Sequence, residues 1–191
     1  MSANAKILAF AGSTRTDSFN KTLLRTAVRA AEAAGASVTT IDLADYRMPI
    51  YDGDLEAESG LPENAVKLKS LFMEHNGLLI AAPEYNSSIT PVLKNTIDWV
   101  SRRDGAPDLS CYAGKTAGLI ATGGGNGGLR GLVHVRQILG NIGVLVIPQQ
   151  AAVRGAWSAF DEGGELKDED QRGTVEAVGA ALADTLAKLH G

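Results

Sequence analysis

The sequence predicts an α/β protein in which a five-stranded parallel sheet is covered by helices on both faces. Five short apolar runs alternate with longer segments whose apolar residues recur at helical spacing. The apolar runs are continuous, as is typical of strands that are buried on both faces. No repeat, linker or low-complexity tract divides the chain, so we expect one domain over residues 1–191.

The first half of the chain is expected to contain strands at residues 6–11, 37–42 and 77–82, separated by helices at residues 21–34 and 62–74. The first helix carries its apolar residues on one face, and Gly35 is suited to end it. Pro62 suits the first turn of the second helix. Residues 43–61 are expected to be irregular, because Pro and Gly interrupt them.

The second half is expected to contain helices at residues 91–102, 129–141 and 168–189 and strands at residues 115–122 and 144–147. Pro91 suits the start of the first of these helices, and residues 103–114 are expected to form a loop. The last helix carries one apolar stripe, formed by Val175, Val178, Leu182, Leu186 and Leu189.

The composition excludes several classes of function. The chain carries 18 Lys and Arg against 22 Asp and Glu, and its net charge of −4 argues against nucleic-acid binding, which usually needs a basic excess. Cys111 is the only cysteine, which excludes an intrachain disulfide and a zinc site built from cysteines. The three histidines lie far apart, so no metal site is expected. No apolar run is long enough to span a membrane and no secretion signal is present, so we expect a cytoplasmic protein.

The loop after the first strand, residues 12–20, has the composition of an anion site. Ligands of open parallel sheets bind beyond the carboxyl ends of the strands, where a helix N-terminus presents backbone N–H groups. This loop adds the hydroxyls of Ser13, Thr14 and Ser18 and the guanidinium of Arg15. Neither GxxxxGK[ST] nor GxGxxG is present, so a mononucleotide phosphate fits better than a nucleoside triphosphate or a dinucleotide. The alternative is simple capping of the helix by Ser18 or Asn20.

Two further loops are unusual. After the third strand, Tyr85 offers an aromatic surface that suits the edge of a flat heterocycle, although an ordinary turn with an exposed tyrosine explains it equally. Glu84 has no second carboxylate or histidine near it in sequence, so no acid–base role is expected. After the fourth strand, Thr122 precedes six residues of which five are glycine. Such a run lets backbone approach a ligand closely, or it forms a flexible turn.

Four motifs in order carry a resemblance to a known family: G-S-x-R-x-x-S-x-N from Gly12, P-E-Y-N from Pro83, L-K-N-x-I-D-W from Leu93, and a glycine-rich loop that ends in G-G-x-R at Arg130. Over about residues 6–150 the chain resembles the NAD(P)H-dependent FMN reductases, which include quinone, azo-dye and chromate reductases. The resemblance implies a flavodoxin-like three-layer sandwich with strand order 2-1-3-4-5.

The resemblance also implies an FMN site made by the three loops. Its cofactor-binding residues would be Gly12, Ser13, Arg15, Ser18, Phe19 and Asn20 in the first loop, Pro83, Glu84, Tyr85 and Asn86 in the second, and Thr122, Gly123 and Gly124 in the third. The first loop would bind the phosphate, the second would pack along the ring mainly through backbone, and the third would approach its pyrimidine side. Met48, Trp157 and Phe160 are candidates to line an outer pocket.

In such proteins the L-K-N-x-I-D-W helix lies at a dimer interface, although by spacing alone Leu93, Ile97 and Val100 suit the core equally well. Gln149 stands where members that form tetramers often carry a glutamate. We therefore expect a homodimer and leave a homotetramer open.

The resemblance implies that bound flavin carries the chemistry and that no side chain is catalytic. Hydride would pass from NADPH or NADH to the flavin N5, and electrons would then pass to a small-molecule acceptor that uses the same open face, with ping-pong kinetics. Arg102 and Arg103 are candidates to meet the 2′-phosphate of NADPH, or they simply close a helix. The main alternative is a flavin electron carrier without nicotinamide turnover, which the mild net charge disfavours.

Overall fold

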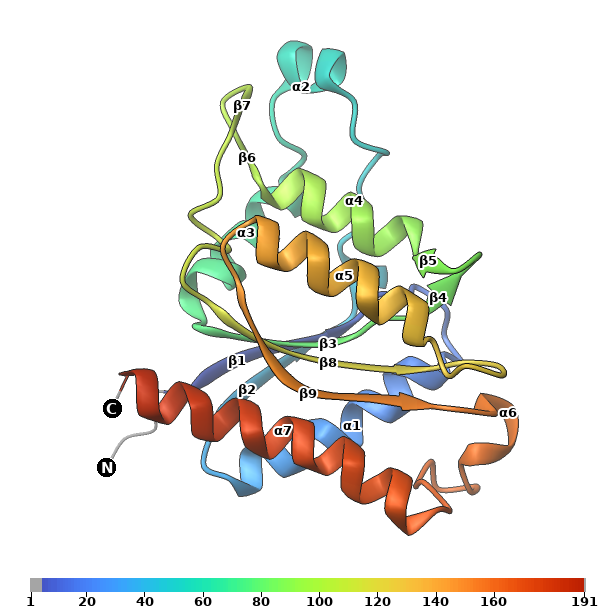
Figure 1. The fold of residues 1–191 in the computed structure, drawn as a ribbon. Helices are drawn as coiled ribbons and strands as arrows, with labels where there is room; N and C mark the ends of the chain where they lie inside the picture. Colours follow the sequence, from blue (N-terminus) through green and yellow to red (C-terminus); the bar gives the residue numbers. More distant parts are fainter. Residues whose placement is uncertain (1–4, 191) are drawn as a thin grey trace.

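The computed structural model describes residues 5–190, in which five parallel strands form one sheet between two layers of helices (Figure 1). The strands are β1 (Lys6–Ala11), β2 (Ser37–Ile41), β3 (Gly77–Ala81), β8 (Thr116–Thr122) and β9 (Leu145–Val153). They lie in the order β2-β1-β3-β8-β9, and each neighbouring pair is parallel. The predicted flavodoxin-like order is confirmed.

The helices divide between the two faces of the sheet. One face is covered by α1 (Phe19–Ala33) and α7 (Glu169–His190), and the other by α3 (Glu63–Glu74), α4 (Pro91–Val100) and α5 (Leu129–Asn141) (Figure 1). Alternate residues of β1 belong to two separate cores: Ile7 to the core under α1 and α7, and Leu8 to the core on the opposite face. Burial on both faces explains why the inner strands β1, β3 and β8 are almost continuously apolar, whereas the edge strands β2 and β9 are partly exposed.

The last strand is longer than predicted. The sequence indicated residues 144–147, whereas β9 continues to Val153 at the edge of the sheet. Its register shifts beside β8, so that Ala117 lies opposite Val146 while Leu119 lies opposite Gln150. Pro148 falls within this bulge, where its missing N–H breaks no ladder bond, so the proline does not end the strand.

The prediction that residues 43–61 are irregular is wrong in part. They contain a 3₁₀ helix (Leu43–Asp45) and the short helix α2 (Gly53–Ser59). Asp42 and Asp52 accept hydrogen bonds from the first N–H groups of these helices. Both helices are too short and polar to show a hydrophobic period, and the segment that carries α2 projects beyond α4 (Figure 1).

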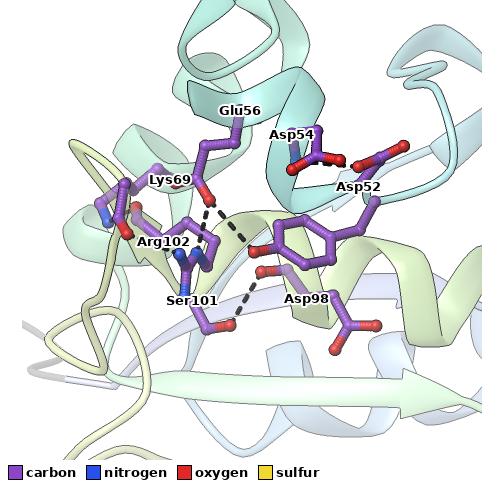
Figure 2. A network of polar contacts seen from close by, with 9 residues as sticks. Asp52, Asp54, Glu56, Lys69, Asp98, Ser101 and Arg102 are labelled. Carbon is purple, nitrogen blue, oxygen red and sulfur yellow. Dashed lines mark hydrogen bonds and ion pairs between the residues drawn. The ribbon is translucent and has the colours of Figure 1, made fainter. Parts of the chain in front are cut away.

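The projecting segment is held by one buried carboxylate (Figure 2). Glu56 of α2 is 3% exposed and accepts hydrogen bonds from Arg102 Nε at 2.8 Å and the Tyr51 hydroxyl at 3.1 Å. Arg102 belongs to a hairpin of β6 (Arg102–Arg103) and β7 (Ala106–Pro107). Helix α4 ends at Val100, two residues before its predicted end, and the rest of the hairpin lies in the predicted loop at residues 103–114. A buried carboxylate needs such partners, so Glu56 ties two peripheral segments together.

Three short elements lie beyond the carboxyl ends of the main strands, in segments for which the sequence predicted no helix or strand. They are the strands β4 (Glu84–Tyr85) and β5 (Ser88–Ile89), which pair as a hairpin, and the helix α6 (Ala156–Ala159). The two turn residues of the hairpin, Asn86 and Ser87, have φ values of 50° and 66°. Positive φ at both positions is the geometry of a tight two-residue hairpin turn, and Asn is among the residues that tolerate it.

Glu84 joins this hairpin to the glycine-rich loop. Its carboxylate accepts hydrogen bonds from the Gly131 N–H at 3.0 Å and the Asn126 side-chain amide at 3.2 Å, and Arg130 lies 3.9 Å away. Burial alone would raise the pKa of Glu84, but the donors from Gly131, Asn126 and Arg130 outweigh it and lower this pKa. The carboxylate also faces the first turn of α5, where a negative charge is stabilising.

Glu84→Gln is expected to lower the free energy of unfolding by about 1–2 kcal/mol at neutral pH, because charge-assisted hydrogen bonds become neutral ones. Since the folded pKa is lowered, this contribution is present above the unfolded pKa and is lost as pH falls through the folded one. Urea unfolding of both proteins, from neutral pH to about pH 3, measures it. Glu162→Gln is the matched control, because Glu162 is exposed and is in none of the ion pairs found among the described residues. If Glu84→Gln and the parent protein had the same free energy of unfolding at neutral pH, this role of Glu84 would be contradicted.

Candidate functional site

The loops at the carboxyl ends of β1, β3 and β8 enclose a cavity of about 230 Å³. Ten of the predicted cofactor-binding residues line it: Ser13, Arg15, Ser18, Phe19, Asn20, Pro83, Glu84, Tyr85, Thr122 and Gly123. Gly12 lines an adjoining cavity of about 220 Å³ that shares Ser13, Arg15 and Tyr85 with the first. The fold therefore gathers most of the predicted set at one place.

The N-terminus of α1 is open to this cavity. Ser18 is the N-cap residue and is 5% exposed, yet its hydroxyl makes no capping hydrogen bond. The capping alternative for Ser18 and Asn20 is therefore wrong. The first N–H groups of a helix without a capping side chain carry partial positive charge and remain available to an anion.

Arg15 adds a full positive charge to the same end of the cavity. Its side chain is exposed, and none of the ion pairs found over residues 5–190 includes it. The backbone turn that presents it is closed by a hydrogen bond from the Arg15 N–H to the Ser13 hydroxyl at 3.3 Å. A guanidinium that is in no ion pair, beside an open helix N-terminus, has the chemistry of a phosphate site.

The side chain of Asn20, which lines the cavity, also makes hydrogen bonds within the chain. Its amide donates to the Thr122 carbonyl at 2.9 Å and accepts from the Thr122 N–H at 3.0 Å. Both hydrogen-bonding groups of this 5%-exposed side chain are therefore used within the chain. The side chain of Asn20 thus holds α1 against the end of β8. The second hydrogen of its amide group and its backbone N–H are not used by these two bonds.

The glycines of the loop after β8 have distinct roles. Gly127 and Gly128 have φ values of 67° and 91°, and a Cβ on either would lie within 2.8 Å of neighbouring atoms of the chain. Packing of the loop against β8 and β9 therefore requires these two glycines, whatever ligand is bound. Gly123 lines the cavity, whereas Gly124 does not and lies next to the Trp157 ring.

Two members of the predicted set lie outside both cavities, and two residues that line the larger cavity were not in that set. Asn86 forms the hairpin turn, and Gly124 packs near Trp157. Ala156 and Trp157 of α6 line the larger cavity. Trp157 was predicted as a candidate to line an outer pocket. No pattern in the sequence indicates Ala156, whose N–H donates a hydrogen bond to the Gly123 carbonyl. Of the other outer-pocket candidates, Phe160 stacks on Phe19 and Met48 lines a separate groove.

The apolar residues of the L-K-N-x-I-D-W helix belong to the core. Leu93, Ile97 and Val100 are at most 5% exposed within the single chain. These three side chains are therefore not available to a partner subunit.

The arginine pair at the end of this helix is engaged within the chain. Arg102 pairs with Glu56, and Arg103 with Asp108. Neither is a free guanidinium of the kind that Arg15 presents.

Other chemistries receive no support from residues 5–190. These residues contain no group of three or more His, Cys, Asp and Glu side chains able to hold a metal ion. They contain no helix that is both long and apolar enough to cross a membrane. Burial raises the pKa of the Cys111 thiol, which makes it a poor nucleophile.

Comparison with known proteins gives consistent results. Residues 5–158 match the NADPH-dependent FMN reductase family. The chain is 33% identical to an NAD(P)H:quinone oxidoreductase of Solanum tuberosum, over 97% of this chain and 95% of that protein. It is 32% identical to an NAD(P)H-dependent FMN reductase of Pseudomonas aeruginosa, over the full length of both.

Among solved structures, the flavoenzyme NAD(P)H:(acceptor) oxidoreductase of Paracoccus denitrificans superposes with a TM-score of 0.80 and 26% identity, covering 96% of this chain and 98% of that one. Fold, cavity and family match agree: the chain belongs to the NADPH-dependent FMN reductase family and is an oxidoreductase of the FMN reductase and quinone reductase type.

Proposed function

We propose that this protein takes hydride from NAD(P)H and delivers electrons to a small-molecule acceptor, with FMN held in the cavity at the carboxyl ends of β1, β3 and β8. The observation that carries the proposal is the open N-terminus of α1 beside the unpaired Arg15. When bound, FMN accepts hydride and passes electrons on, so the reaction needs no nucleophilic or acidic side chain.

The phosphate would be held at the α1 end of the cavity. The Ser13 and Ser18 hydroxyls, the Arg15 guanidinium and the N–H groups of Phe19 and Asn20 are its donors. Both serines are at most 6% exposed, so their hydroxyls are positioned before the ligand arrives. A dianionic phosphate satisfies the helix N-terminus that no side chain caps.

The flat ring would lie along Pro83, Tyr85 and the Gly123 backbone. Glu84 lines the same cavity, but its carboxylate is engaged by Gly131 and Asn126 and its pKa is lowered. It therefore stays ionised at neutral pH and serves as a support of the loop, with no part in proton transfer.

The acceptor would use the same side of the cavity as the nicotinamide. Tyr85 is half exposed at its edge, so the cavity wall stays open there. Two substrates that share one opening bind in turn, which gives ping-pong kinetics. The curated relatives are named for quinone and FMN, and we propose a quinone, a free flavin, an azo compound or a similar molecule as the acceptor.

The wider organisation is also part of the proposal. Residues 1–191 would form one FMN-binding domain that acts in the cytoplasm as a homodimer, with a homotetramer as the larger alternative. Sedimentation velocity at micromolar concentration tests the assembly, and a monomer at all concentrations would contradict it.

Arg15→Ala is expected to weaken FMN binding by roughly 1.5–3 kcal/mol, because a charge-assisted hydrogen bond to the phosphate is lost. Isothermal titration of the apoprotein with FMN measures this. Riboflavin, which lacks the phosphate, should bind both proteins equally. Arg172→Ala is the matched control, because Arg172 pairs with Glu169 and Glu176 on α7. An unchanged FMN affinity in Arg15→Ala would remove Arg15 from the site.

An anaerobic spectrum of the FMN-loaded protein tests the reaction itself. Addition of NADPH or, separately, NADH is expected to bleach the flavin band, with NADPH as the better donor. A bound flavin that stays oxidised with both nucleotides would indicate an electron carrier that depends on a protein partner.

A further inference from the structure

Trp157 combines high exposure with a position in the wall of the cavity. Its side chain is 73% exposed, which is unusual for the largest apolar residue, and it lines the cavity that contains Ser18, Tyr85 and Gly123. A single exposed apolar side chain needs no explanation on an open surface. Here it lies where a ligand with an aromatic ring is proposed to bind.

The backbone that carries Trp157 is firmly held. The Gly155 N–H donates to the Gly124 carbonyl at 3.2 Å, and the Ala156 N–H donates to the Gly123 carbonyl at 3.0 Å. On the other side of α6, Phe160 stacks on Phe19 with ring centroids 6.1 Å apart and planes 3° apart. The short helix is thus fixed both to the glycine-rich loop and to the start of α1.

These contacts place the indole beside the part of the cavity proposed for the ring. The Trp157 ring lies 3.8 Å from the position that a Cβ on Gly124 would take, next to Gly123 in the cavity wall. Tyr85 is 50% exposed and lines the same cavity from the β4–β5 hairpin. An exposed aromatic side chain on a fixed backbone loses little conformational entropy when it meets a flat ligand.

We propose that Trp157 contacts the ring system of the bound flavin mononucleotide and slows its release. This inference rests on the proposed function and adds to it a residue outside the matched sequence motifs. The indole buries apolar surface when the ligand binds, because most of it is exposed in the structure. In this proposal Trp157 contacts the ring and Arg15 contacts the phosphate. Loss of Trp157 should therefore affect FMN and riboflavin alike, whereas loss of Arg15 should affect FMN alone.

Trp157→Ala is expected to weaken FMN binding about tenfold, the size of one lost aromatic contact to a flat ring, mainly through faster dissociation. It should weaken riboflavin binding by the same factor, because riboflavin keeps the ring and lacks the phosphate. Trp157→Phe should retain most of the affinity. Leu145→Ala is the matched control, since Leu145 is also exposed but lies at the opposite end of β9.

A spectroscopic measurement tests the contact without reference to activity. Trp99 is fully buried, and Trp157 is the other tryptophan of the chain. Acrylamide should quench the exposed Trp157 in the apoprotein and should quench it several-fold less after FMN is added. Subtracting the emission of Trp157→Phe isolates this signal from that of Trp99.

The outcomes separate the inference from the function on which it rests. If Trp157→Ala binds and releases FMN like the parent protein, the inference is overturned while the FMN site stands. If Trp157→Ala weakens FMN but leaves riboflavin unchanged, the indole does not contact the ring and the inference is again overturned. If the parent protein binds no FMN, both proposals fall together.

Discussion

The side-chain amide of Asn20 is the contact on which the arrangement of the site depends. In a parallel sheet, successive strands are joined by separate crossovers, so no local hydrogen bond aligns the loops at their carboxyl ends. The paired hydrogen bonds between Asn20 and Thr122 supply this alignment across 102 positions of sequence. They fix the N-terminus of α1 relative to the end of β8. Glu84 does the same between the β4–β5 hairpin and α5, so hydrogen bonds join the three loops into one wall of the cavity.

The same end of the sheet carries features that do not serve stability. Ser18 is placed as an N-cap but does not cap, and Arg15 is in none of the ion pairs found among the described residues. Trp157 is exposed on a backbone that is held on both sides. A protein optimised for stability alone would cap the helix, pair the cation and bury the ring. These features, which do not favour stability, lie in one cavity, whereas both cores are apolar. Such a distribution is expected of a binding site.

Sequence patterns predicted the large elements well because their causes are local or nearly so. Apolar runs and helical spacing mark the strands and the long helices, and burial on both faces of the sheet explains the runs in the inner strands β1, β3 and β8. The failures have equally physical causes. Helix α2 is held by Glu56, whose partner Arg102 lies 46 positions away. Strand β9 continues through Pro148 only because a bulge against β8 accommodates it. Neither cause is visible in a short window of sequence.

By itself, the sequence determined the fold class, the strand order through its motifs, and the residue types gathered for an anion and a flat ring. Tertiary structure decided what each of these residues does. The side chain of Asn20 holds two segments together, and Asn86 forms a turn. Two glycines of the loop after β8 are required by packing. The side chains of Leu93, Ile97 and Val100 lie in the core. The physical reason is that a polar side chain takes the nearest partner that folding brings to it. That partner is set by the packing of distant segments, whereas the tendency to form a strand or a helix is carried by the local chain.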